Sequence, residues 1–345
     1  MDYNKLLGRD PISTDLNSIQ DYIKGKRVLV TGGAGSIGSE IVRQLISFGT
    51  STVTVYDNAE ASMFHLEQEI SRSFPKSHIK YVIGDVRDKY RLEEVFDSFK
   101  PNIVFHAAAY KHVPLVEENI SKAIENNIIG TKNTIDTSIA NNVESFILIS
   151  TDKAVRPTNV MGATKRVCEL YLQNVDSKNT KLAAVRFGNV LGSSGSVIPK
   201  FEEQIKKGGP LTVTHEEITR YFMLIPEACE LVLQAGAIAK KSEIFVLDMG
   251  KPVKILDLAK QFKKLSGRED VQIKITGLRA GEKLYEELLI DESDIRTDYK
   301  DIFIGRKTFY EVDRLSKDIE SLIKSSRQVE VLKNILPEFE HKLNG

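Results

Sequence analysis

The sequence predicts an α/β fold: a doubly wound parallel sheet with a smaller C-terminal α/β lobe. Between residues 27 and 187, short apolar runs alternate with longer segments of helical periodicity. This alternation is typical of a parallel sheet that carries helices on both faces. After Gly188 the alternation becomes irregular, and the last part of the chain contains only short α/β pieces. The second half of the chain is therefore expected to build a separate lobe.

The expected elements of the first half are short strands, apolar along most of their length, each followed by a helix. Strands are predicted at Arg27–Thr31, Thr52–Tyr56, Ile79–Ile83, Ile103–His106, Ser145–Ser150 and Leu182–Phe187. Helices are predicted at Ser36–Phe48, Ala59–Ser73, Asp88–Phe99, Leu115–Asn141 and Asn159–Asn174. The second half is expected to hold helices at Val197–Lys207, which ends at Gly208-Gly209-Pro210, and at Pro226–Lys240, and a strand at Ile244–Leu247.

These elements divide the chain into three parts. Residues 1–25 form a polar arm without a clear period. Residues 26–190 form the first domain, to which segments around residues 211–250 are expected to return. Residues 191–210 and 251–345 are expected to form the second lobe.

The composition excludes several classes of protein. The 345 residues include 48 basic and 48 acidic side chains, and this balance gives no support to a nucleic-acid binder. Cys168 and Cys229 are far apart and are expected to be buried, reduced thiols. The six histidines show no spacing typical of metal ligands, so no metal is expected. No apolar run reaches the length of a membrane span and the N-terminus has no signal-peptide pattern, so we expect a cytoplasmic protein.

A glycine-rich segment, Thr31–Gly38, begins where the first strand ends and continues into the first helix. Its glycines, Gly32, Gly35 and Gly38, permit a tight turn, close approach of a pyrophosphate and close helix–strand packing. The helix N-terminus adds free N–H groups and about half a positive charge. Asp57 ends the second strand, 19 residues after Gly38, and is placed to accept both hydroxyls of an adenosine ribose. The pattern predicts a Rossmann-type dinucleotide site that prefers NAD to NADP, because a 2′-phosphate would be repelled by Asp57 and no arginine follows it.

Two further segments are expected to border the same site, because they follow the third and fourth strands. They are Gly84–Asp88, in which Asp85 is expected to meet the adenine edge, and His106–Ala109, whose small side chains allow a flat cofactor to lie against the backbone. The predicted cofactor contacts are Gly32, Gly35, Ser36, Ile37, Gly38, Asp57, Asn58, Asp85, Val86, Ala107, Ala108 and Lys165.

Motifs along almost the whole chain carry a resemblance to a known group of enzymes. They are Thr31–Gly38, Ala107–Glu117, Asn127–Thr131, Ser150–Lys153, Met161–Lys165, Arg186–Gly192 and Arg279–Lys283. By them the chain resembles the extended short-chain dehydrogenase/reductases, and within that group the bacterial nucleotide-sugar 4,6-dehydratases of polysaccharide and glycan synthesis. Met161 stands four residues before Lys165, where most of these enzymes have a tyrosine base. This Met points to the branch that resembles UDP-N-acetylglucosamine 4,6-dehydratases retaining the configuration at C5.

Larger members of that branch carry an N-terminal membrane domain, and Leu6–Pro11 resembles the junction to such a domain. A natural form without that domain and a trimmed chain are both open at this point.

The resemblance implies an NAD-dependent hydro-lyase. C4 of the hexose is oxidised to a ketone, water is eliminated across C5–C6, and hydride returns to C6, which gives a 4-keto-6-deoxy sugar. Asp152 is expected to be the acid that protonates the leaving hydroxyl, with a pKa raised by burial, and Lys153 the base at C5, with a lowered pKa. Thr151 is expected to hold the C4 hydroxyl and Lys165 the nicotinamide ribose. Met161 cannot accept a proton and is expected to fill space.

The residues expected to contact a UDP-sugar are spread along the chain. Lys111 and His112 follow the alanine run, and Asn189, Lys200, Arg220, Arg279 and Glu282 lie on segments that resemble nucleotide-sugar contacts. Asn127 is expected in mid-helix, where it stabilises the active site. Two alternatives stay open: a nucleotide-sugar 4-epimerase, and a non-catalytic NAD-binding regulatory protein. A homo-oligomer, built through the two long helices, is also expected.

Overall fold

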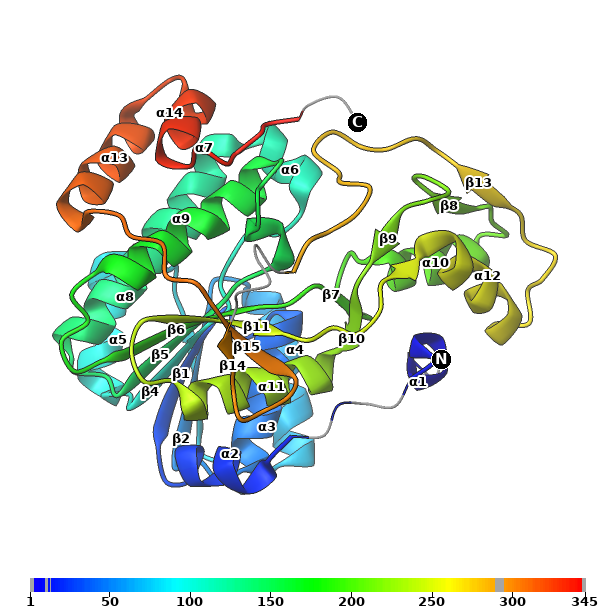
Figure 1. Cartoon of the computed structure of the whole chain (residues 1–345). Coiled ribbons are helices and arrows are strands. Elements are labelled where there is room, and N and C mark those ends of the chain that lie inside the picture. The colour runs from blue at the N-terminus through cyan, green and yellow to red at the C-terminus, as the bar shows by residue number, and fades with distance from the viewer. Residues whose placement is uncertain (1–2, 10–11, 13, 289–294, 343–345) are drawn as a thin grey trace.

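A nine-stranded sheet forms the centre of the molecule in the computed structural model, which describes residues 3–9, 12, 14–288 and 295–342 (Figure 1). The strand order is β14-β15-β11-β6-β5-β4-β1-β2-β3, which places the first strand inside the sheet. The first six strands and β11 run parallel, whereas β15 is antiparallel to β11 and β14 to β15. The predicted doubly wound α/β class is confirmed.

The strands of this sheet are short and buried in most of their length. They are β1 Arg27–Thr31, β2 Thr52–Asp57, β3 Ile79–Ile83, β4 Ile103–His106, β5 Ser145–Ile149, β6 Lys181–Arg186, β11 Glu243–Leu247, β14 Ile295–Arg296 and β15 Ile302–Gly305. In the register, Thr31 of β1 lies beside His106 of β4 and Tyr56 of β2. The carboxyl ends of the parallel strands therefore meet at one edge, where open α/β sheets bind ligands.

Helices cover both faces of the sheet and enclose two apolar cores. One face carries α2 Leu16–Ile23, α3 Ser36–Ser47, α4 Glu60–Ser73 and α11 Ile225–Ile238. The other carries α5 Lys89–Phe99, α6 Val113–Glu118, α7 Ile120–Ala123, α8 Gly130–Ala140, α9 Val160–Asn174, α13 Val312–Lys324 and α14 Gln328–Ile335. Residues 160–173 of α9 are all buried, because neighbouring helices surround it. Helices α13 and α14 of the same chain pack against α9.

The predicted long helix at 115–141 is not continuous. It consists of α6, α7, a π-helical turn η1 at Ile124–Ile129, and α8. The arm at residues 1–25, for which no period was visible, contains α1 Tyr3–Leu7 and α2, whose N-cap Asp15 accepts from the Ser18 N–H.

The second lobe surrounds a third, smaller core. Its elements are β7 Asn189–Leu191, α10 Val197–Lys206, β8 Leu211–Val213, β9 Thr219–Arg220, β10 Phe222–Leu224, β12 Val253–Lys254, α12 Ile255–Leu265 and β13 Ile273–Ile275, with α1 packed against them. Two placements differ from the expected division. β8, at 211–213, pairs with β13 of the second lobe, whereas β15, α13 and α14 pack with the first domain. No helix among the described residues is long and apolar enough to cross a membrane.

Candidate active site

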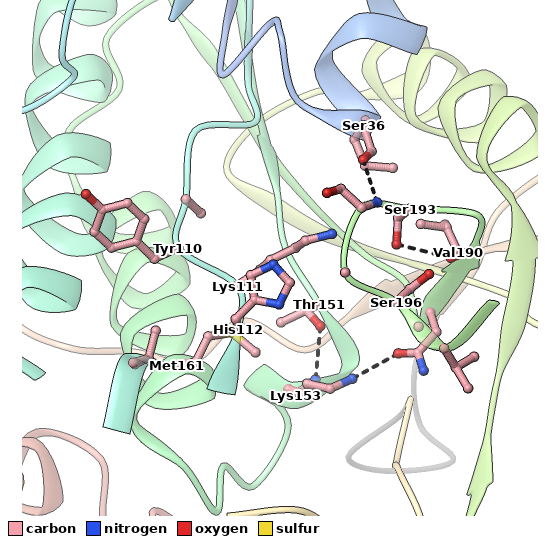
Figure 2. Close-up of a pocket in the computed structure, with 18 of the residues that line it drawn as sticks. Ser36, Tyr110, Lys111, His112, Thr151, Lys153, Met161, Val190, Ser193 and Ser196 are labelled. Carbon is pink, nitrogen blue, oxygen red and sulfur yellow. Dashed lines mark hydrogen bonds between the residues drawn. The ribbon is translucent and has the colours of Figure 1, made fainter. Parts of the chain in front are cut away.

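A cavity of about 940 Å³ lies between the carboxyl edge of the sheet and the second lobe. A smaller hollow of about 210 Å³ adjoins it on the side of β2 and β3. Both are bordered by the glycine-rich turn and by the alanine run after β4. Across the large cavity, the Ser194 N–H donates to the Ser36 hydroxyl at 3.1 Å, which links the first helix of the sheet domain to the second lobe (Figure 2).

The glycine-rich turn leaves no room for side chains. Gly32 has φ +64°, and a Cβ there would lie 2.5 Å from the Ala108 nitrogen. A Cβ on Gly38 would lie 2.1 Å from the Gly32 carbonyl oxygen, so only glycine lets α3 start this close to the turn. The Asp57 carboxylate accepts from the backbone N–H groups of Ala34 and Ala59, each at 2.9 Å. Turn and carboxylate therefore form one rigid unit that fits a dinucleotide at the N-terminus of α3.

Nearly all of the predicted cofactor contacts border one of the two cavities. Gly32, Gly35, Ser36, Ile37, Gly38, Ala107 and Lys165 line the larger one, and Asp57, Asn58, Val86 and Ala108 line the smaller. Asp85 lines neither. Its carboxylate accepts from the Arg87 backbone N–H at 2.8 Å and from the Arg87 guanidinium at 2.9 and 2.5 Å, and the guanidinium lowers the pKa of this carboxyl. Gly84 and Val86, on either side of Asp85, border the smaller hollow instead.

The segment after β5 forms a 3₁₀ turn, η2 Asp152–Ala154, at the floor of the large cavity. The Thr151 hydroxyl donates to Asp152 Oδ1 at 2.8 Å, and the Lys153 ammonium donates to the same oxygen at 3.0 Å and to Asn189 Oδ1 at 3.2 Å. Thr151 and Lys153 line the cavity (Figure 2). Asp152, between them in the chain, is fully buried. Thr151 therefore lies where it can connect the buried carboxylate with a molecule in the cavity.

The pKa expected for Lys153 is wrong for this structure. Burial acts to lower the pKa of its ammonium, but the carboxylates of Asp152 and Glu286 outweigh burial, and the pKa of Lys153 is raised. The sequence did not reveal Glu286 as a partner, and without it the sign of the change was not predictable. In this structure Lys153 is a charged donor at neutral pH.

Helix α9 brings Met161 and Lys165 to the cavity. Asn159 caps the helix by accepting from the Gly162 N–H at 2.9 Å. Met161 lines the cavity and is only 4% exposed, as expected for a side chain that fills space. Lys165 is buried, and burial lowers its pKa. The helix start is thus fixed so that both side chains face the same cavity.

The π-helical turn places Asn127 opposite α9. Its amide donates to the Tyr110 carbonyl and to the Thr164 hydroxyl, each at 3.0 Å, and its Oδ1 accepts from the Tyr110 N–H at 2.8 Å. π-Helical turns are frequent at functional sites. Here the turn connects the segment after β4 to α9 by direct hydrogen bonds.

The structure brings together the seven residues predicted to contact the substrate: Lys111, His112, Asn189, Lys200, Arg220, Arg279 and Glu282 all line the large cavity. Burial lowers the pKa of Lys111, of Lys200 and of the His112 imidazole, and the Lys111 charge acts in the same direction on His112. Arg220 lies 3.6 Å from a Glu282 oxygen. The site is thus rich in cations, which suits a diphosphate.

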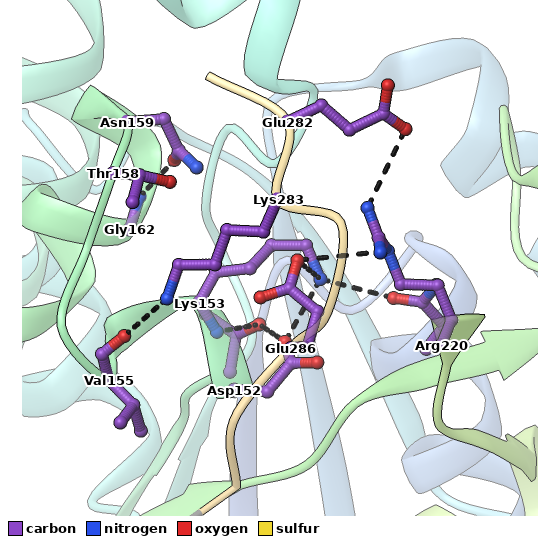
Figure 3. A network of polar contacts seen from close by, with 12 residues as sticks. Asp152, Lys153, Val155, Thr158, Asn159, Gly162, Arg220, Glu282, Lys283 and Glu286 are labelled. Atoms are coloured by element: carbon purple, nitrogen blue, oxygen red, sulfur yellow. Dashed lines mark hydrogen bonds and ion pairs between the residues drawn. The ribbon is translucent and has the colours of Figure 1, made fainter. Parts of the chain in front are cut away.

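Sequence reasoning missed several residues. Tyr110, Thr212, Thr214 and Lys122 also line the cavity. Lys283 donates to the Val155 carbonyl at 3.0 Å, and Glu286 lies 3.6 Å from Lys153 Nζ (Figure 3). Lys283 and Glu286 belong to the segment after Arg279, which crosses from the second lobe to the η2 turn. No local pattern separates these residues from their exposed neighbours.

The C-terminal tail holds this crossing segment in place. The Gly281 N–H donates to the Lys342 carbonyl at 2.8 Å, and the Lys342 N–H donates to the Thr158 carbonyl at 3.0 Å. The Gly281 carbonyl accepts from the Thr158 hydroxyl at 3.3 Å and from the Asn159 amide at 3.1 Å. Among the described residues, no group of three or more potential ligands is arranged to hold a metal ion.

Comparison with known proteins finds relatives named for polysaccharide biosynthesis. The chain is 51% identical over 336 residues to the capsular polysaccharide biosynthesis protein CapD of Staphylococcus aureus, which covers 95% of this chain and 56% of the relative. It is 54% identical to the probable polysaccharide biosynthesis protein EpsC of Bacillus subtilis, over 82% of this chain and 48% of the relative. The chain thus spans about half the length of these curated relatives.

Other relatives match over most of their own length. An inverting UDP-N-acetylglucosamine 4,6-dehydratase of Campylobacter jejuni is 36% identical over 80% of both chains. The X-ray structure of Pen from Bacillus thuringiensis is 36% identical, with a TM-score of 0.76, over 84% of this chain and 90% of that one. The family model of polysaccharide biosynthesis proteins matches residues 28–307. The chain therefore belongs to the polysaccharide biosynthesis protein family, and its fold is that of the short-chain dehydrogenase/reductases.

Proposed function

We propose that this protein catalyses the NAD-dependent 4,6-dehydration of a UDP-N-acetylhexosamine, UDP-N-acetylglucosamine in the first instance, for the synthesis of a surface glycan or polysaccharide. The observation that carries the proposal is the η2 turn, where the Thr151 hydroxyl and the Lys153 amine face a large cavity above a buried Asp152. The relative named as a UDP-N-acetylglucosamine 4,6-dehydratase supports the substrate.

NAD fits the glycine-rich turn, with Asp57 at the adenosine ribose and Lys165 at the nicotinamide ribose. A solved structure of similar fold, the UDP-glucose 4-epimerase of Thermus thermophilus in complex with NAD, is 26% identical with a TM-score of 0.66, over 76% of this chain and 90% of that one. When bound, NAD supplies the hydride acceptor for C4 and the hydride donor for C6 of the same sugar. All other steps depend on the side chains of the chain itself.

Proton transfers in the proposed reaction follow the hydrogen bonds of the η2 turn. The Thr151 hydroxyl gives its proton to Asp152, 2.8 Å away, as it takes the proton of the C4 hydroxyl. The reacting form is the minor one in which Lys153 is a neutral amine, because Asp152 and Glu286 raise the pKa of this group. The amine takes the C5 proton, and Asp152 returns its proton through Thr151 to the C6 hydroxyl, which leaves as water. Lys153 finally gives its proton back to C5. The sugar thus loses one water and the side chains end as they began.

Configuration at C5 follows from this scheme. One group, Lys153, both removes and returns the C5 proton, so protonation on the face that was deprotonated retains the configuration. The relative from Campylobacter jejuni is named as inverting, and the two outcomes are distinguishable in the product.

The test is to incubate the purified protein with UDP-N-acetylglucosamine in ²H₂O and to determine the product by NMR. A 4-keto-6-deoxy sugar supports dehydration, and the orientation of deuterium or hydrogen at C5 gives the stereochemistry. Lys153→Ala and Asp152→Asn are expected to abolish the product while NAD remains bound. Substrate recovered unchanged, with NAD bound, would overturn the proposal in favour of a regulatory NAD-binding protein.

A second function, 4-epimerisation, is favoured by one specific observation. A relative named UDP-glucose 4-epimerase from Rickettsia rickettsii is 35% identical over 83% of this chain and 85% of the relative. An epimerase returns the hydride to C4 and eliminates no water. In the same NMR experiment, a galacto-configured sugar that retains its C6 hydroxyl would identify this reaction.

A further inference from the structure

Glu286 is a buried carboxylate in direct range of the proposed base. Its side chain is 2% exposed, and its Oε1 lies 3.6 Å from Lys153 Nζ and 3.8 Å from Arg220 Nε (Figure 3). Its other oxygen, Oε2, is buried and makes no hydrogen bond within the described part of the chain. A buried carboxylate left this poorly satisfied costs folding free energy.

A second buried glutamate in the same chain shows how a purely structural carboxylate is held. Glu169 accepts from the Arg186 guanidinium at 2.7 and 2.6 Å and from the Ser150 hydroxyl at 2.7 Å. These contacts outweigh burial, and the pKa of Glu169 is lowered. Glu286 has no contact of hydrogen-bond length in the described chain, and burial raises its pKa. The contacts of Glu169 thus favour its charged form, whereas the surroundings of Glu286 do not. A contribution to folding stability therefore does not explain why a carboxylate is buried at Glu286.

Glu286 is held in this position from the second lobe. The segment that carries it is fixed to the sheet domain by Lys283, which donates to the Val155 carbonyl, and by Gly281, whose carbonyl accepts from Asn159. The carboxylate therefore reaches Lys153 from a different segment than Asp152, which lies in the η2 turn after β5. The Lys153 ammonium has three donors and three oxygen neighbours, on Asp152, Asn189 and Glu286.

We propose that Glu286 is a positioning residue that aims the Lys153 amine at the cavity and sets its protonation state. Three other charged groups face this pair: the Asp152 carboxylate from the end of β5, the Arg220 guanidinium from β9, and the Lys283 ammonium from the same segment as Glu286. Arg220 opposes a charge on Lys153 and Asp152 supports it, whereas Lys283 acts on Glu286 and lowers the pKa of that carboxyl. Glu286 is the second negative charge that keeps the balance on the side of the ammonium.

The inference rests on the proposed function, but its test does not require turnover. The protein would be labelled with ¹³C at the lysine ε-carbons, loaded with NAD, and titrated by NMR; the Lys153→Arg variant assigns the signal by its loss. In Glu286→Gln, which keeps the shape and removes the charge, the titration midpoint of Lys153 is expected to fall by about one pH unit or more. Glu286→Asp keeps the charge and should restore most of the midpoint.

Glu287→Gln is the matched control, because Glu287 is the next residue, its side chain is 42% exposed, and it pairs with Arg156 at a distance of 3.2 Å. Its Lys153 midpoint should match the wild type. An unchanged midpoint in Glu286→Gln, in a variant that still binds NAD, would overturn the proposal. If Glu286→Gln does not fold, Glu286→Met, an unbranched apolar side chain of similar length, replaces it. The Lys153 midpoint should then fall by about one pH unit or more, and an unchanged midpoint in a variant that binds NAD overturns the proposal.

Catalysis provides the second measurement. Where dehydration is observed, the acid limb of the kcat–pH profile should move to lower pH in Glu286→Gln by the same amount as the Lys153 midpoint, since more Lys153 is then a neutral amine. A limb that stays in place while the midpoint moves would overturn the link between Glu286 and the reaction. A wild type that makes no 4-keto-6-deoxy sugar would refute the proposed function alone, because the midpoint still decides the role of Glu286.

Discussion

Gly162 offers a direct way to displace Lys153 without touching its side chain. This glycine lies in the first turn of α9, packed against the η2 turn, and a Cβ there would lie 2.1 Å from the Lys153 carbonyl oxygen. Real Cβ atoms essentially never come within 3.0 Å of such an atom, so in Gly162→Ala the carbonyl must retreat by about 0.9 Å. The new contact is with backbone rather than with a flexible side chain, which leaves no inexpensive way to relieve it.

Such a shift moves Lys153 away from both of its short contacts, at 3.0 Å to Asp152 and 3.2 Å to Asn189. A displacement of this size at a reacting group costs about 100-fold in rate, which corresponds to about 2.7 kcal/mol of barrier. We expect kcat for dehydration to fall by about this factor, whereas NAD binding, which depends on the glycine-rich turn, should be unchanged. The assay is the initial rate of 4-keto sugar formation together with the bound NAD content.

Gly305→Ala is the control, because its new Cβ would meet its nearest neighbour, the Ile244 carbonyl oxygen, at an ordinary 3.5 Å and lies outside the site. It should keep the wild-type rate. A Gly162→Ala variant with kcat within threefold of the wild type would refute the reasoning that the α9–η2 contact places the base.

Three further predictions concern other parts of the site. Asp57→Ala removes an acceptor of the ribose and of the Ala34 and Ala59 N–H groups, so the Kd for NAD, measured by calorimetry, should rise about 10- to 100-fold; an unchanged Kd would contradict the placement of the adenosine. Met161→Leu should leave kcat within threefold and the pH profile unaltered, since the sulfur accepts no proton, and a tenfold loss would contradict a role in packing alone. Burial, with the Lys165 charge, lowers the pKa of His106 from 6.5 to about 3. Between these pH values the imidazole binds a proton in the unfolded chain but not in the folded one, so the free energy of unfolding falls as the pH falls. His106→Asn should flatten this slope in urea titrations, and exposed His65→Asn should not; equal slopes in all three proteins would exclude His106 as the cause.

The features predictable from sequence are those whose signal is local. The glycine-rich turn and Asp57 follow from strand, turn and helix patterns within about 30 residues. The seven residues predicted to contact the substrate, chosen from their place after the alanine run or on segments that resemble nucleotide-sugar contacts, all line the large cavity. The prediction of one long helix at 115–141 was wrong, because a π-helical turn around Asn127 interrupts it. Asn127 in this turn is held by Tyr110 and Thr164, and helical periodicity does not reveal these contacts.

Long-range packing decided the remaining differences. Nothing in the composition of α13 or α14 indicates that they cover α9. The pairing of β15 with β11 places Ile302 beside Leu247, which lies 55 residues earlier in the chain. Glu286 follows Glu282 and precedes Glu287 in a segment rich in acids, and only the fold shows that Glu286 alone of these is nearly inaccessible. The sign of the Lys153 pKa change depended on that same residue.

The hydrogen bonds between the C-terminal tail, Thr158, Asn159 and Gly281 affect how a sugar nucleotide reaches the floor of the cavity. Separating the lobes at this corner would break the three hydrogen bonds of Gly281, one of them between main-chain groups. At the glycine-rich turn, the bond between the Ser194 N–H and the Ser36 hydroxyl joins the two parts of the molecule. If the lobes part to admit a sugar nucleotide, the serine side is therefore expected to open before the corner beside α9.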